Sequence, residues 1–230
     1  MEDVWGAQMR SIWALLWKDI TIEWRTREGL ASVGGFCLAT LLIFYFALGP
    51  EPERMEEAGP GVLWATYVLA GVVGAGRAFA SEERNGCLEG LLSAPVGRGT
   101  IYLGKFSAGL LRMLAVEGFT LPLFAVLYGF SLQGRVLQLS GVVLTLGAVG
   151  LVAVGTLFSG LTLRARAREA LLPVLILPIA VPIVIGAVEA SRLVFSGGWE
   201  EAVRWVRLLG AFDITFLAIA WMVFEYVIEE

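Results

Sequence analysis

The chain is 230 residues long, 57% hydrophobic and only 17% charged, with a formal net charge of −4. A soluble domain carries about a quarter of its residues as charges, so this composition favours an integral membrane protein. The sequence contains no histidine, which removes the most common metal ligand, general base and axial haem ligand. Because the net charge is small and no basic cluster stands out, the sequence does not indicate nucleic-acid binding.

The first element, residues 5–25, has the pattern of an amphipathic helix rather than of a membrane span. Its apolar residues recur at spacings of three and four, while charged residues occupy the other positions. The apolar set is rich in tryptophan and comprises Trp5, Met9, Ile12, Trp13, Leu16, Ile20 and Trp24. Since tryptophan is enriched at membrane interfaces, we expect this helix to lie along the inner interface. A helix packed on a partner protein is the alternative.

Six apolar stretches follow, each close to the roughly 20 residues that a helix needs to cross the hydrocarbon core. They are expected near residues 30–48, 61–80, 106–130, 139–163, 171–188 and 208–228. Eleven Lys and Arg residues fall before span 1 or in the connections on the same side, against five on the other side. Positive charge gathers on the cytoplasmic side, so both ends of this sequence are expected there. The sequence thus predicts an all-α fold, with residues 1–230 forming a single transmembrane permease domain.

Proline, small residues and amphipathic patterns predict local features of these spans. Residues 49–60 are expected to form an acidic, proline-bearing outer loop, and residues 199–208 an amphipathic outer helix before the last span. Three prolines in span 5 are expected to kink or break it. Small residues four apart in spans 2 and 4 allow helix backbones to approach closely, within this chain or in a dimer. The prolines are Pro173, Pro178 and Pro182, and the small pairs are Ala70/Gly74, Gly71/Ala75, Gly155/Ser159 and Thr156/Gly160.

Residues 81–95, between spans 2 and 3, form the most informative connection. Span 2 is expected to continue to Asn85-Gly86, which has the sequence of a left-handed helix cap. A short helix over residues 87–93 would carry three leucines on one face, with acidic residues around it. Such a face outside the membrane favours docking in a groove of a protein, and a helix folded back on lipid is the alternative. The candidate docking residues are Glu82, Glu83, Leu88, Glu89, Leu91 and Leu92.

Four charged residues fall within the predicted spans, where ionisable groups are costly and are functional candidates. Glu117 is the deepest and is a candidate for the transport path, with a buried structural contact as the alternative. Arg112 is expected to lie about two turns from the inner end of its span, where its long side chain can reach the interface. Asp213 and Glu225 are expected near the two ends of span 6. The sequence assigns no role to Arg112, Asp213 or Glu225.

The order of these elements resembles the permease of an ABC-2 type exporter. The pattern from Glu82 through Gly86-x-Leu88-Glu89-x-Leu91-Leu92-x-x-Pro95 to Lys105 is similar to the coupling segment of that superfamily. Within it, the chain most resembles the haem exporter protein B (CcmB) family of the cytochrome c maturation system. An aspartate often occupies the position of Asn85 in such sequences. The similarity is carried by residues 46–52, 58–64 and 171–182.

The resemblance implies a permease subunit in the cell inner (plasma) membrane that works with several partners. These are an ATP-binding cassette subunit (CcmA-like), a second copy of the permease, and membrane subunits that handle haem (CcmC-like and CcmD-like). ATP and haem would be bound by those partners, so no catalytic, cofactor-binding or metal-binding residue is expected in this chain. The sequence also lacks the G-x-x-x-x-G-K-[ST] phosphate loop that a P-loop ATPase needs.

Two other classes of function stay open at the level of the sequence. A general ABC-2 exporter for a lipid-like or amphipathic substrate would share the coupling segment without needing the Gly-Pro-rich stretch at 49–61. A membrane-embedded enzyme or a proton-driven carrier would need no docking helix and would depend on Glu117.

Overall fold

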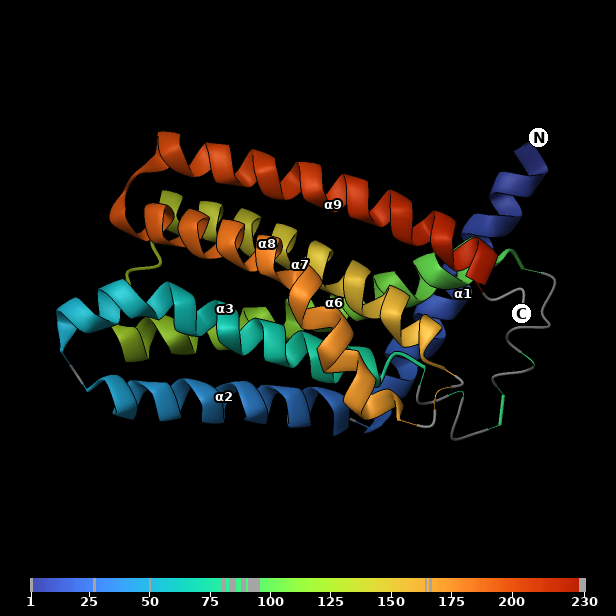
Figure 1. Ribbon diagram of the computed structural model, residues 1–230, viewed down its shortest axis with the longest axis horizontal. Helices are drawn as coiled ribbons and strands as arrows, with labels where there is room; N and C mark the ends of the chain where they lie inside the picture. Colours follow the sequence, from blue (N-terminus) through green and yellow to red (C-terminus); the bar gives the residue numbers. More distant parts are fainter. Residues whose placement is uncertain are drawn as a thin grey trace.

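The computed structural model describes residues 2–26, 28–49, 51–79, 82, 86–87, 90, 96–163, 165 and 167–227. Within these residues the protein is all-helical (Figure 1). Its long helices are α1 (Glu2–Thr26), α2 (Glu28–Leu48), α3 (Pro52–Gly76), α6 (Arg98–Tyr128), α7 (Arg135–Leu161), α8 (Arg168–Ser196) and α9 (Trp199–Val227). All of these except α1 contain a stretch long and apolar enough to cross a membrane. The six predicted spans and the all-α membrane class are therefore confirmed.

Both ends of α3 differ from the prediction. The helix begins at Pro52, so most of the expected outer loop at 49–60 is helical. Proline is well tolerated there, because the first helical turn has no partners for its N–H groups. The helix ends at Gly76, followed by tight bonds from the N–H groups of Arg77 and Ala78 to the carbonyls of Gly74 and Ala75. The prediction of a continuous helix to residue 85 is therefore wrong.

The predicted outer helix at 199–208 is helical but is not a separate element. It is the first part of α9, which runs without interruption into the last span. The break falls earlier, at Gly197, whose φ of 84° ends α8 in the left-handed conformation that favours glycine. After it, Ala202 and Leu209 are buried in the same core as residues of α8, so this segment packs on the bundle. α8 itself remains one helix that bends along its length, as Figure 1 shows, although it contains three prolines.

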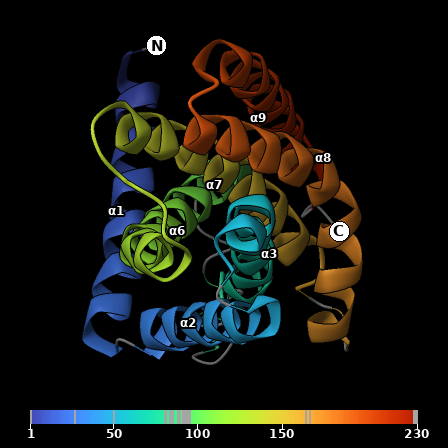
Figure 2. The ribbon, with the colours of Figure 1, turned by 90° about the vertical axis from the view of Figure 1, so that its left-hand side faces the viewer.

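α7 lies at the centre of the bundle, in contact with α3, α6, α8 and α9 (Figure 2). In the most apolar 18-residue stretch of α7, 61% of the residues are buried. The corresponding share is 28% in α2 and 17% in α9. α2 covers α3 and α6 on one side, and α9 covers α7 and α8 on the other. The apolar outer faces of α2 and α9, together with exposed apolar residues of α6 and α8, are thus surfaces that this chain presents to lipid or to another membrane protein.

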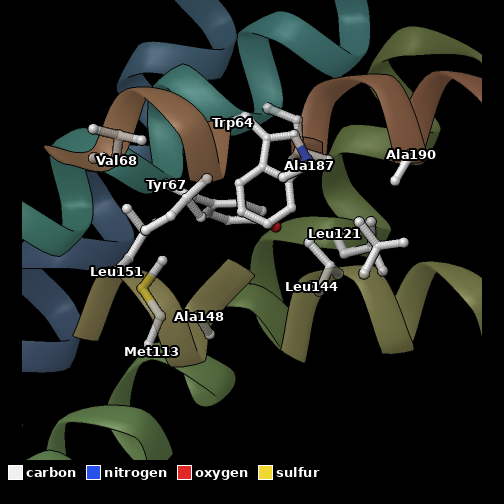
Figure 3. Packing of buried hydrophobic residues seen from close by; sticks show 14 of the residues in the cluster. Trp64, Tyr67, Val68, Met113, Leu121, Leu144, Ala148, Leu151, Ala187 and Ala190 are labelled. Carbon is white, nitrogen blue, oxygen red and sulfur yellow. The ribbon is translucent and has the colours of Figure 1, made fainter. Parts of the chain in front are cut away.

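The core is built around the indole of Trp64 on α3 (Figure 3). Its Nε1 donates a hydrogen bond to Ser191 Oγ of α8 at 2.9 Å, which satisfies the polar atom of a fully buried ring. The ring lies directly over Gly147 of α7, where an added Cβ would come within 2.0 Å of it. Three helices therefore meet at one aromatic side chain because one of them has no side chain at that point.

The small residues predicted to pack helices closely do so within the chain. Ser159 of α7 donates a hydrogen bond to the carbonyl of Ala75 in α3 at 2.8 Å, and a Cβ at Gly155 would lie 3.1 Å from Ala75 Cβ. Gly160 instead makes room for the ring of Phe224 on α9. Close approach of this kind is the usual way that helices associate in lipid.

α1 crosses one end of the bundle at a steep angle to the other helices (Figures 1 and 2). It packs on α6, while Met9, Trp13 and Trp17 are 66%, 64% and 62% exposed. A helix of this orientation with exposed tryptophans has the features of an interfacial helix. We use the term "α1 end" for this end of the bundle, which also carries Phe79, Glu82 and the start of α6.

Candidate functional site

A buried cluster of charged side chains at the α1 end joins α1, α6 and the segment 81–95. The ammonium nitrogen of Lys105 in α6 lies 2.7 Å from Glu82 Oε1 and 2.9 Å from Asp19 Oδ2 of α1. The side chains of Lys105, Glu82 and Asp19 are only 2%, 3% and 8% exposed. Lys18, which is 41% exposed, also pairs with Glu82 and lies 3.3 Å from Asp19. These four residues are termed the ion cluster.

The ion cluster balances two positive and two negative charges in a site with little water. Burial alone raises the pKa of Glu82, but the charge and hydrogen bond of Lys105, together with those of Lys18, outweigh it and hold that pKa below its ordinary value. Burial alone lowers the pKa of Lys18, but its hydrogen bond to Glu82 and the charges of Asp19 and Glu82 raise it overall. Glu82 and Lys18 are thus both charged near neutral pH. Removing one would leave an opposite charge buried without a partner, which is costly.

The close approach of α1 to α6 depends on a glycine beside the lysine. A Cβ at Gly104 would lie 3.0 Å from Leu15 Cβ, so α1 packs directly on the backbone of α6 at this point. Asp19 follows Leu15 by one helical turn on the same face of α1 and therefore meets Lys105, the next residue after Gly104. The ring of Phe79 lies 5.2 Å from the Lys105 ammonium and covers the same site.

The segment that carries Glu82 ends in a helix-capping turn. The N–H of Cys87 donates to the carbonyl of Glu82 at 2.9 Å, and Gly86 between them has a φ of 64°. A bond across five residues with a left-handed glycine is the Schellman arrangement that ends helices. The cap predicted at Asn85-Gly86 is therefore confirmed at Gly86, although the turn does not belong to α3.

Of the predicted docking residues, the structure describes Glu82 alone. Glu82 is 4% exposed and pairs with two lysines of the same chain, so it is not at a surface where a partner could reach it. The prediction of a docking role required an exposed carboxylate, and for Glu82 we replace it with a role inside the ion cluster. Gly86, Cys87 and Gly90 of the same segment are exposed. Glu83, Leu88, Glu89, Leu91 and Leu92 lie outside the described residues.

Lys105 is the residue of this site that sequence reasoning assigned to the wrong place. The sequence places it in a loop between spans, whereas it lies two turns inside α6. The sequence did contain an indication that Lys105 has a partner. Lys105 lies among apolar and small residues, and a lysine on the buried face of a helix requires a partner of opposite charge. The coupling-segment pattern included both Glu82 and Lys105 but did not indicate that they are in contact.

Glu117 occupies the interior of the bundle, between α6 and the helices α2 and α3. It is 2% exposed, and neither carboxylate oxygen has a hydrogen-bond partner among the described residues. Cys37 of α2 and Tyr67 of α3 are close enough to interact electrostatically with it. The hydroxyls of Tyr67 and Thr120 are hydrogen-bonded to each other at 3.0 Å, one turn further along α6. Glu117 is therefore buried without a hydrogen-bond partner in the described part of the chain, and both a transport role and a buried structural contact stay predictions.

The other charged residues of the spans have three different surroundings. Arg112 pairs with Glu23 of α1 at 3.2 Å, so it reaches the interfacial helix as expected of a long side chain near the end of a span. Asp213 is 3% exposed and packs against Gly150 of α7, with no hydrogen-bond partner among the described residues. Glu225 is exposed near the end of α9.

At the α1 end, three parts of the chain that are far apart in sequence are joined through one lysine, because Lys105 pairs with both Glu82 and Asp19. Among the described residues, no group of three or more Cys, Asp or Glu side chains is placed to hold a metal ion.

Comparison with known proteins identifies the family. The family model described as "CcmB protein" matches residues 10–229 of this chain. The heme exporter protein B of Rhodobacter capsulatus is 31% identical over 185 residues, which cover 78% of this chain and 81% of that protein. The heme exporter protein B of Paracoccus denitrificans is 28% identical over 209 residues, covering 90% and 93%. That of Pseudomonas aeruginosa is 28% identical over 180 residues, covering 77% and 80%.

Proposed function

This chain belongs to the CcmB protein family, and from that premise we propose that it is the membrane permease subunit of an ABC transporter complex that acts in haem export and haem-chaperone loading for cytochrome c maturation. The observation that carries the proposal is the match over residues 10–229, together with relatives named heme exporter protein B along most of the chain. Its six candidate spans are those of a multi-pass membrane protein.

ATP hydrolysis is assigned in this proposal to a partner subunit. The sequence has no P-loop, so a partner with an ATP-binding cassette must supply the energy. The partner docks on the segment 81–95 through Leu88, Leu91 and Leu92, with Glu83 and Glu89 pairing with its basic residues. The exposure of Gly86, Cys87 and Gly90 supports a surface role for this segment.

The ion cluster gives the proposed coupling a physical route. Glu82 begins the docking segment and is bonded to Lys105 of α6, which is bonded to Asp19 of α1. When the partner closes around ATP and moves the segment, these buried pairs carry the displacement to α6 and α1 together. Separating them would expose unpaired charges in a site that excludes water, so the cluster moves as one body.

The same proposal places the α1 end on the cytoplasmic side of the inner membrane, where the ATP-binding subunit works. It includes a second copy of the permease and haem-handling membrane subunits, which bind the haem that a chain without histidine is poorly equipped to ligate.

Glu117 is assigned to the transport path, because a buried carboxyl without a hydrogen-bond partner among the described residues is costly to keep for structure alone.

The proposal is tested in a bacterium from which the gene has been deleted. We expect c-type cytochromes, detected by covalently bound haem after denaturing electrophoresis, to be absent and to return with the wild-type gene. A variant with Leu91→Asp and Leu92→Asp should be inserted in the membrane but should not restore them. Normal c-type cytochromes in the deletion strain, with a defect in the export of a lipid instead, would favour the general ABC-2 exporter.

A further inference from the structure

Two carboxyl groups are buried inside the bundle without hydrogen-bond partners in the described part of the chain. Glu117 is 2% and Asp213 is 3% exposed, and all four of their oxygens lack a partner. A buried polar group in this state requires an explanation, and water or an ion is the usual one. A cavity lies next to the helix face that carries Glu117.

That cavity lies between α2, α3, α6 and α7 and has a volume of about 40 Å³. Because one buried water molecule needs a cavity volume on the order of 10–15 Å³, this cavity has room for a few water molecules. Asp19, Lys105 and Arg112 line it at the α1 end and provide the polar partners that such water needs. Small residues form its walls, namely Gly71, Gly74, Gly109 and Gly155.

The cavity ends close to Glu117 at three apolar residues. Val33 of α2, Ala70 of α3 and Val116 of α6 line it and are packed with Cys37 in one buried cluster. Glu117 follows Val116 directly, and Cys37 and Tyr67, the neighbours of Glu117, come from the same two helices as Val33 and Ala70. From Lys105 to Glu117 the helix advances by about 18 Å at 1.5 Å per residue. The three residues are termed the apolar plug.

We propose that Glu117 is a proton-binding carboxyl that exchanges its proton with water in this cavity, and that the apolar plug closes the connection in the present conformation. When the apolar plug opens, the carboxylate takes one proton from water in this cavity, and it returns the same proton to that water when the plug opens again. No other reactant is needed.

The groups that face Glu117 are compatible with this role. They are the thiol of Cys37 from α2, the phenol of Tyr67 from α3 and the hydroxyl of Thr120 on its own helix. None of them is a cation that would fix the carboxylate in its charged form. Arg112, the basic residue nearest in sequence on α6, pairs with Glu23 at the cavity.

Asp213 serves as an internal comparison. It is as deeply buried and also lacks a hydrogen-bond partner in the described part of the chain. Neither carboxyl lines the cavity itself, but Val116 beside Glu117 does, whereas Gly150 of α7 and Ile183 of α8, on which Asp213 packs, do not. If reactivity toward a reagent depends on burial alone, Glu117 and Asp213 should react alike. If it depends on the cavity, only Glu117 of these two should react.

The test measures carbodiimide labelling of the full chain in lipid vesicles, read by mass spectrometry of the peptides that contain Glu117 and Asp213. A lipid-soluble carbodiimide should modify both carboxyls and verifies that each is reactive. A water-soluble carbodiimide with glycine ethyl ester should modify Glu117 slowly and leave Asp213 unmodified. In Val116→Ala, Glu117 should react roughly tenfold faster, because two buried methyl groups are removed from the barrier.

A cavity-filling variant tests the route from the other direction. An added Cβ at Gly74 meets nothing within 4 Å, so Gly74→Leu extends into the cavity without a clash at the backbone and should reduce labelling of Glu117 by the water-soluble reagent. Gly141→Leu, also in open space but away from the cavity, is the matched control and should not change it.

Equal labelling of Glu117 and Asp213 by the water-soluble reagent, or equal rates in the wild type, Val116→Ala and Gly74→Leu, would overturn the inference. The inference does not rest on haem export. A chain that labels as expected but fails to restore c-type cytochromes would contradict the proposed function alone, and the reverse result would contradict this inference alone.

Discussion

Lys105 Nζ and Glu82 Oε1 lie 2.7 Å apart, although 23 residues separate them, and both side chains are almost completely buried. This ion pair joins the start of the segment 81–95 to α6, and a second pair, between Lys105 and Asp19, joins α6 to α1. Coupling through this site is possible because charges that are paired away from water resist separation.

Replacing the lysine should destabilise the protein strongly. In Lys105→Met the carboxylates of Glu82 and Asp19 lose their buried partner, and a loss of about 3–5 kcal/mol in unfolding free energy is expected. Thermal unfolding of the purified chain in detergent measures it. Arg54→Met is the control, since it removes an exposed pair with Glu51 that is worth about 1 kcal/mol or less. Similar changes in the two variants would show that the ion cluster does not stabilise the fold.

The contribution of Glu82 should depend on pH in a defined direction. Its pKa is held below the ordinary 4.5 in the folded protein, so its contribution to stability is complete above about pH 4.5 and is lost as the pH falls through the lowered value. The difference in unfolding free energy between the wild type and Glu82→Gln should therefore be constant near neutral pH and shrink on acidification. Denaturant unfolding at several pH values measures this difference, and a gap that widens in acid would contradict the assignment.

The pKa of Lys18 is raised, so its contribution has the opposite dependence on pH. It is complete below the ordinary value of 10.5 and is lost as the pH rises through the raised value. Glu82 and Lys18 should consequently both contribute fully to stability between these two limits. Glu51→Gln, at an exposed pair, is the control for general effects of pH on the chain.

Topology is checked with single cysteines in a background that carries Cys37→Ala and Cys87→Ser. An impermeant thiol reagent added outside should label Arg54→Cys, Arg135→Cys and Trp199→Cys, which begin α3, α7 and α9 at the end opposite α1. Gly90→Cys, Arg98→Cys and Arg166→Cys should be labelled only after the inner face is opened. Labelling of the last three from outside would reverse the proposed orientation or alter the number of spans.

The sequence predicted the number and order of the spans because a membrane span depends on length and composition alone. It did not predict the ends of α3, since Pro52 and Pro60 suggested a loop. Pro52 is in fact compatible with the start of a helix, and Pro60 lies inside the helix. It also separated residues 199–208 from α9, because their amphipathic pattern resembles an interfacial helix. That pattern instead reflects one face packed on the bundle, including Ala202 and Leu209.

The candidate site was predicted in part. Glu82 and Lys105 were both recognised, yet their contact depends on how α1, α6 and the segment 81–95 fold together, which spacing along the chain does not encode. A carboxylate next to leucines was therefore interpreted as a surface group. Glu117 is buried, as its position within the predicted span suggests, while its lack of a partner among the described residues depends on the neighbouring helices. Asp213, expected near an end of its span, lies at mid-length of α9.

The permease purified alone should carry no stoichiometric haem. Without histidine, the side chains able to ligate iron axially are those of Met, Cys and Tyr. Met9 and Met222 are 66% and 55% exposed, whereas Met113 and Cys37 are packed in apolar clusters as ordinary core residues. An absorption spectrum of the washed protein measures this directly. A Soret band at one haem per chain would show that this subunit holds haem itself.

In the proposed mechanism, a partner ATPase docks on the segment 81–95 and drives the permease through the ion cluster. The most direct test is co-purification and ATPase activity of the complex with Leu91→Asp and Leu92→Asp. We expect the partner to be lost, or to be no longer stimulated, while the permease remains in the membrane at wild-type level. Normal binding and normal stimulation by the doubly substituted permease would contradict it.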